Sequence, residues 1–112
     1  MQEFSKEIEC RILTTGETIL TKVFSFYLTK NDISNRWLNA RDFMQVANLE
    51  NPDTERVGNL LRSQLKSQAE ESIYITQGFV RINDRGEIST LNRGGSDFTA
   101  TIIGAALNAS EI

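Results

Sequence analysis

Apolar residues recur with helical spacing in three stretches of the chain. Between about Lys6 and Thr29 they form one wide apolar stripe, which predicts a long helix. Gly16 interrupts the stripe, and glycine inside a helix costs about 1 kcal/mol relative to alanine, so we expect a kink or a junction of two helices there. Asn51 as cap and Pro52 in the first turn predict the start of a second helix. A third helix is predicted over residues 97–107.

The segments between these helices have the composition of short strands. Residues 34–40 and 72–76 are the first two, and residues 79–82 and 87–90 flank a turn in which Gly86 is free to take a positive φ. The order is therefore helix, strand, helix, strand, hairpin, helix. Strands that alternate with helices predict an α/β fold, with a mainly parallel sheet and a β-hairpin before the last helix.

The loop between the last strand and the last helix carries the residue types of a ligand site. Gly94 and Gly95 let the backbone approach a ligand, and Ser96 and Asp97 can cap the helix that follows. Free N–H groups and the helix dipole favour an anion there, and the guanidinium of Arg93 suits a carboxylate or a phosphate. The same residues also suit a surface turn before a capped helix, so both interpretations stay open at this point.

Composition narrows the function classes. The chain has 112 residues, a net charge of −3 and 39% apolar residues, which indicates one ordinary globular domain and gives no reason to expect a nucleic-acid partner. The single cysteine, Cys10, excludes an internal disulfide and is expected to be a small buried side chain. The lack of histidine excludes serine–histidine chemistry and histidine metal sites. With no apolar run of membrane length and no signal peptide at its start, the sequence predicts no membrane partner and a cytoplasmic protein.

Several segments resemble one enzyme family. Residues 90–97, Thr-Leu-Asn-Arg-Gly-Gly-Ser-Asp, resemble the Thr-Leu-Gly-Arg-Gly-Gly-Ser-Asp signature of aspartate kinases (aspartokinases), which belong to the amino-acid kinase superfamily. Residues 76–79 resemble the family's Thr-Gln-Gly-Phe segment, residues 12–25 its Gly-Glu helix, and residues 105–109 a helix end. The resemblance runs from about residue 12 to residue 112. It implies a partial three-layer α/β/α amino-acid kinase fold.

The resemblance also implies roles for the glycine loop. Arg93 would bind a carboxylate of the aspartate substrate, and Ser96 and Asp97 would bind its amino and polar ends. Gly94 and Gly95 would lie close to the transferred phosphate and the nucleotide. Asp97 and the two glycines are thus the implied catalytic residues, in a reaction that needs positioning and charge neutralisation more than a side-chain nucleophile.

Two further residues gain an implied role. By itself Glu17 is a solvated helix residue, but its place in the Gly-Glu helix implies contact with the substrate's amino group, a charge-assisted hydrogen bond. Phe79 is either a core residue or, as the resemblance implies, a neighbour of the bound aspartate, with Gly78 giving access. The chain departs from the family at Asn92 and Arg81, where relatives have glycine. No residue is assigned to a metal.

The implied parent enzyme transfers the γ-phosphate of ATP, with Mg²⁺, to the β-carboxylate of L-aspartate, the first step toward lysine, threonine and methionine. Residues 1–112 would be the central part of its catalytic domain, without the N-terminal Lys-Phe-Gly-Gly segment and the C-terminal nucleotide-binding and regulatory parts. We expect this piece alone to be inactive, to hold no cofactor tightly and to form a homo-oligomer. The alternatives are a stand-alone, non-catalytic binding or assembly module and, less favoured by the signature, an amino-acid kinase for another substrate such as glutamate.

Overall fold

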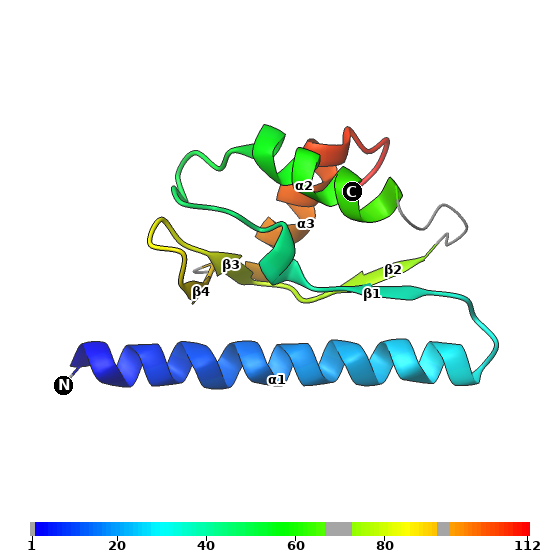
Figure 1. Cartoon of the computed structure of the whole chain (residues 1–112), viewed down its shortest axis with the longest axis horizontal. Helices are drawn as coiled ribbons and strands as arrows, with labels where there is room; N and C mark the ends of the chain where they lie inside the picture. Colours follow the sequence, from blue (N-terminus) through cyan, green and yellow to red (C-terminus); the bar gives the residue numbers. More distant parts are fainter. Residues whose placement is uncertain (1, 67–72, 92–94) are drawn as a thin grey trace.

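The computed structural model describes residues 2–66, 73–91 and 95–112, and their arrangement is that of an α/β protein. The elements in chain order are α1 (Gln2–Lys30), β1 (Arg36–Leu38), the 3₁₀ turn η1 (Ala40–Asp42), α2 (Thr54–Lys66), β2 (Tyr74–Thr76), β3 (Val80–Ile82), β4 (Ile88–Thr90) and α3 (Gly95–Leu107). Figure 1 shows the strands between α1 on one side and α2 with α3 on the other. This layering confirms the predicted partial α/β/α architecture.

The strand pairings combine parallel and antiparallel contacts. β1 and β2 are parallel, with Trp37 opposite Ile75. An isolated parallel bridge joins Gln45 to Ile82. β3 and β4 form the predicted antiparallel hairpin. Gly86 has a φ of +76° in the hairpin turn, where its N–H donates to the carbonyl of Asn83 at 3.0 Å. The conformation of this turn is therefore as predicted from its glycine.

α1 is one continuous helix, so the expected interruption at Gly16 is wrong. A glycine in a long helix costs only about 1 kcal/mol, and hydrogen bonds of the neighbouring turns outweigh that cost. The helix ends where predicted: Asp32 takes a φ of 60°, and the N–H of Ile33 donates to the carbonyl of Leu28 at 2.9 Å. This left-handed residue and the bond behind it form a Schellman-type end.

The second helix begins later than predicted. It starts at Thr54, and the cap is Asp53, whose carboxylate accepts a hydrogen bond from the N–H of Arg56 at 3.0 Å. Asn51 and Pro52 precede the helix, and the carbonyl of Pro52 accepts from the N–H of Thr54. Asparagine and aspartate are equally good caps, and the residue type alone does not choose between them.

The first strand is shorter than the predicted 34–40. It ends at Leu38, because the side chain of Asn39 accepts a hydrogen bond from the N–H of Arg41 at 3.2 Å and caps η1. Such local side-chain bonds compete with strand pairing. The turn buries Phe43 and Met44 completely behind it.

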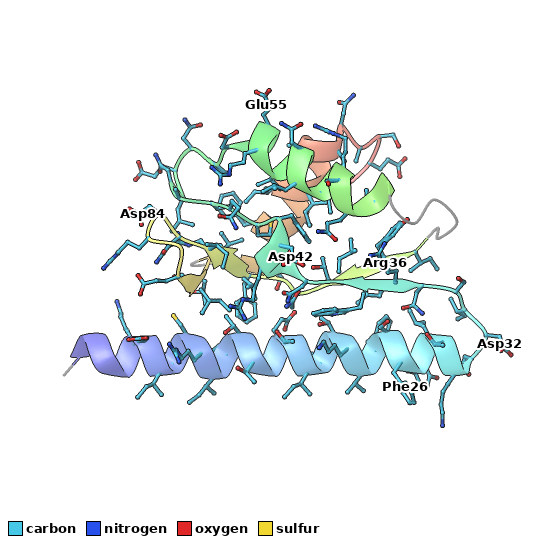
Figure 2. The ribbon with its side chains drawn as sticks, in the orientation of Figure 1. Phe26, Asp32, Arg36, Asp42, Glu55 and Asp84 are labelled. Atoms are coloured by element: carbon cyan, nitrogen blue, oxygen red, sulfur yellow. The ribbon has the colours of Figure 1, made fainter. Side chains whose placement is uncertain are left out.

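The hydrophobic core lies on the α2–α3 side of the strands. Its buried members come from the strands, η1, α2, α3 and the segments that follow η1 and β4, and they are Leu38, Ala40, Phe43, Met44, Val46, Val57, Leu61, Val80, Leu91, Ile102 and Ala106. α1 faces the strands largely with hydroxyl groups; Thr14, for example, is only 2% exposed. Many of its apolar side chains point outward, including Ile12 at 66% and Phe26 at 63% exposure, and Figure 2 shows Phe26 directed away from the strands. In the described part of the chain no helix is long and apolar enough to span a bilayer.

Candidate functional site

The helix after the glycine loop begins at Gly95, two residues earlier than predicted. Ser96 and Asp97 therefore lie exposed inside its first turn, and the expectation that they cap the helix from outside is wrong. Their position at the N-terminal end of α3 still suits an anionic group near the free N–H groups of the first turn. Arg93 and Gly94 lie outside the described residues, so their implied roles remain predictions.

Glu17 points from α1 toward the turn after β2. Its Oε1 atom accepts a hydrogen bond from the N–H of Gly78 at 3.1 Å, and the residue is half-buried. A purely solvated helix residue would not make this long-range contact. The structure thus brings Glu17 to Gly78, the residue that precedes Phe79.

Two close approaches join the turn after β2 to the first turn of α3. A Cβ atom on Gly78 would lie 2.7 Å from the Oγ atom of Ser96, and a Cβ on Gly95 would collide with the Cβ of Phe79. Real Cβ contacts are not that short, so these two positions require glycine for close backbone packing. Glu17, Phe79, Gly95 and Ser96, which were predicted from separate segments, consequently lie around one point of the fold.

Phe79 has an unusual backbone conformation at this point. Its φ is +52°, which is uncommon for a residue with a Cβ, so the strand begins at Val80 and not at Phe79 as predicted. Its N–H donates to the Oγ1 atom of Thr99 at 2.9 Å, and its carbonyl accepts from the N–H of Leu91 at 2.7 Å. The ring also packs against the core, so Phe79 is both a core residue and a neighbour of the site.

Two buried polar residues of the site were missed at the level of sequence. Thr99 is 4% exposed; besides accepting from Phe79, its hydroxyl donates to the carbonyl of Gly95 at 2.9 Å. Gln77 is 1% exposed and bonds to groups on α1 and beside η1. The signal available in the sequence was a polar residue inside an apolar segment, but its partners are distant in sequence and could not be inferred.

Arg81, a position where the chain departs from the family pattern, forms hydrogen bonds within and beside the hairpin. Its Nε donates to the carbonyl of Thr90 at 2.9 Å, and its guanidinium also donates to the carbonyl of Val46 at 2.8 Å. Burial lowers the pKa of Arg81, and the nearby Asp84 carboxylate partly opposes that shift. Arg81 therefore holds β3 to β4 and to the segment before α2, next to the end of the strand that leads into the glycine loop.

A separate cavity of about 420 Å³ lies beside the hairpin turn, and none of the predicted site residues lines it. Its polar walls include Asp53 and Asn83, whose side chains accept hydrogen bonds from nearby backbone N–H groups. These groups are engaged in capping a helix and a turn, so we assign them no chemistry. Among the residues that the structure describes, no group of three or more acidic, histidine or cysteine side chains is arranged to hold a metal ion.

Comparison with known proteins identifies the family to which this fold belongs. Residues 5–112 match the model of the amino acid kinase family, and the chain therefore belongs to that family. Within it, the similarity is to aspartokinases. The chain is 33% identical over 104 residues to lysine-sensitive aspartokinase 3 of Escherichia coli, covering 90% of this chain and 23% of that protein. It is 30% identical over 116 residues to the aspartokinase of Chlamydia trachomatis, covering 100% of this chain and 26% of that one.

Solved structures of aspartokinase III agree with this family assignment. E. coli aspartokinase III in complex with lysine and aspartate superposes with a TM-score of 0.82 at 31% identity, over 95% of this chain and 24% of that chain. The same enzyme in complex with aspartate and ADP gives a TM-score of 0.81. The predicted fold and family are therefore confirmed. The chain spans about a quarter of the length of these relatives.

Proposed function

We propose that this chain forms the aspartate-binding part of the catalytic domain of a cytoplasmic aspartate kinase. The observation that carries the proposal is the convergence of Glu17, Gly78 and Ser96. The carboxylate from α1 meets the backbone N–H of Gly78, and Gly78 packs against Ser96 in the first turn of α3. Aspartokinase III of E. coli, a relative with this fold, has been solved in complex with aspartate.

The chemical parts suit an amino acid with two carboxylates. Glu17 uses one oxygen for Gly78, and its other oxygen would accept from the substrate's ammonium group. The first turn of α3 would direct N–H groups toward a carboxylate, and Arg93 would add a cation beside it. The ring of Phe79 would close one wall, held by the bonds of its backbone to Thr99 and Leu91.

In the proposed reaction an oxygen of the β-carboxylate of L-aspartate attacks the γ-phosphorus of ATP. The bond from that phosphorus to the bridging oxygen breaks, and ADP leaves with the electron pair. Gly94 and Gly95 would allow the phosphate to approach the backbone, and Asp97 would orient the reactants. Mg²⁺ would neutralise phosphate charge when bound. We propose that the 112-residue chain by itself binds aspartate but does not turn over.

Two measurements on the chain test this proposal. Isothermal titration calorimetry should show binding of L-aspartate and weaker binding of D-aspartate, because Glu17 and the α3 turn fix the position of the amino group. A coupled assay for ADP release in the presence of ATP, Mg²⁺ and aspartate should show no activity above background. Absence of aspartate binding would refute the substrate site, and aspartate-dependent ADP release would refute the proposed inactivity.

The alternative, an assembly module, is supported by one specific observation. α1 presents Ile12, Ile19, Val23 and Phe26 at 58–66% exposure, an unusually apolar outer face. A second copy of the chain would cover this face by packing its own α1 against it. Sedimentation velocity should then show a dimer that Ile19→Glu converts to a monomer. A monomeric wild-type chain would exclude this association.

A further inference from the structure

Gln77 joins two elements that carry the proposed site. Its Oε1 atom accepts a hydrogen bond from the N–H of Ala40 at 2.7 Å. Its Nε2 atom donates to Thr18 Oγ1 at 3.1 Å and to Asn39 Oδ1 at 3.0 Å. One buried amide thus ties the end of β2 to α1 and to the corner between β1 and η1.

The hydrogen-bond directions are determined by the neighbours. The N–H of Ala40 can only donate, so the amide oxygen must face it. The hydroxyl hydrogen of Thr18 is committed to the carbonyl of Thr14 at 2.8 Å, and Asn39 Oδ1 already accepts from the N–H of Arg41. Both therefore act as acceptors toward Gln77. Only an uncharged amide of this length supplies one acceptor and two donors in this arrangement.

The partners of Gln77 lie next in sequence to the residues of the site. Thr18 follows Glu17 on α1, and Gln77 precedes Gly78 in the turn after β2. The bonds Gln77–Thr18 and Gly78–Glu17 consequently form a two-point connection between α1 and that turn. If the first bond is removed, we expect the carboxylate of Glu17 to be held less firmly beside Gly78.

We propose that Gln77 is a positioning residue that sets the preference of the site for a dicarboxylate bearing an amino group, acting through Glu17. This inference rests on the proposed aspartate site and deepens it. The proposed effect concerns the selectivity for the amino group, because Gln77 bonds to Thr18, the neighbour of the Glu17 carboxylate that would meet the ammonium.

The experiment compares L-aspartate with succinate, which has both carboxylates and lacks the amino group. Gln77→Glu keeps the acceptor toward Ala40 but cannot donate to Thr18 or Asn39 when ionised. Thr18→Val removes the same connection from the α1 side. Each variant should lower the affinity for L-aspartate at least tenfold and change the affinity for succinate less than twofold. The double variant should be no worse than Gln77→Glu alone, because that single variant already loses the bond between residue 77 and Thr18.

A ligand-free measurement accompanies the titrations. Hydrogen exchange of the Gly78 amide should become at least tenfold faster in both variants relative to the amide of Ile82, which donates to Met44 in the core. Gln45→Glu, at a half-buried glutamine on the other side of η1, is the matched control and should leave both measurements unchanged. Equal losses for aspartate and succinate, or an unchanged Gly78 exchange rate, would overturn the inference. A wild-type chain that binds neither ligand would refute the proposed function, and the exchange rate would still decide whether Gln77 holds Glu17.

Discussion

Thr99 holds Phe79 in a left-handed backbone conformation through a 2.9 Å hydrogen bond from the Phe79 N–H. The same hydroxyl donates to the carbonyl of Gly95, so one side chain joins the turn after β2 to the first turn of α3. A positive φ at a phenylalanine is strained and persists only where surrounding bonds hold it. The N-terminal end of α3 and the Gly78–Phe79 turn are therefore one structural unit.

Replacement of Thr99 by valine should destabilise the chain. The variant keeps the shape of the side chain but leaves the N–H of Phe79 without an acceptor in a buried place, which costs about 1–3 kcal/mol. Urea unfolding followed by far-ultraviolet circular dichroism measures the change in free energy of unfolding. Thr99→Ser retains the hydroxyl and is the control; equal stability of the valine and serine variants would contradict the role of this bond.

Two glycine-to-alanine variants should have opposite effects. Gly95→Ala places a methyl group against Phe79, and overpacking of this kind costs about 1–3 kcal/mol. Gly16→Ala meets nothing within 4 Å on α1 and should increase stability by about 0.5–1 kcal/mol, since alanine is the better helix former. Thermal unfolding of both variants measures the two changes in stability. A stabilised Gly95→Ala variant would show that α3 does not pack against Phe79 as described.

Trp37 should report on the attachment of α1. The ammonium of Lys22 lies 4.6 Å from the centroid of its ring, and its Nε1–H donates to Thr21 Oγ1 at 2.9 Å. It is the only tryptophan in the sequence, so its fluorescence is assignable without ambiguity. Thr21→Val should shift the emission maximum and lower stability by about 0.5–1.5 kcal/mol, the net contribution of such a bond. Thr101→Val, at an exposed threonine whose hydroxyl donates to the carbonyl of Asp97 within α3, is the control that should leave the emission unchanged.

Glu17→Gln should separate binding from stability. The amide oxygen can still accept from the N–H of Gly78, so the free energy of unfolding should change little. The negative charge that would pair with the ammonium of aspartate is lost, and a charge-assisted bond of about 1.5–3 kcal/mol corresponds to a loss of affinity of roughly tenfold to a hundredfold. Calorimetric titration with L-aspartate measures this loss of affinity. Glu9→Gln, at an exposed position of the same helix, should bind aspartate like the wild type.

Local patterns were sufficient for much of the fold. The Asn83–Gly86 turn with its flanking strands identified the hairpin, because glycine at a positive φ leaves few alternatives. Asn31 and Asp32 marked the end of α1, because such residues tolerate the left-handed conformation in which helices commonly end. The predicted cap of α2 was wrong: Asp53 and not Asn51 caps the helix, and its carboxylate accepts from the N–H of Arg56.

The sequence by itself determined the class of the protein, the order of its elements and the segments that carry the chemistry, since these depend on residue types at short spacing. Only the tertiary structure decided that Glu17 meets Gly78 across 61 residues, that Gln77 and Thr99 are buried connectors, and that the apolar side chains of α1 point outward. Hydrogen bonds between distant segments depend on how helices and strands pack. No periodicity along the chain contains that information. The sequence therefore identified residues of the site but not their arrangement in space.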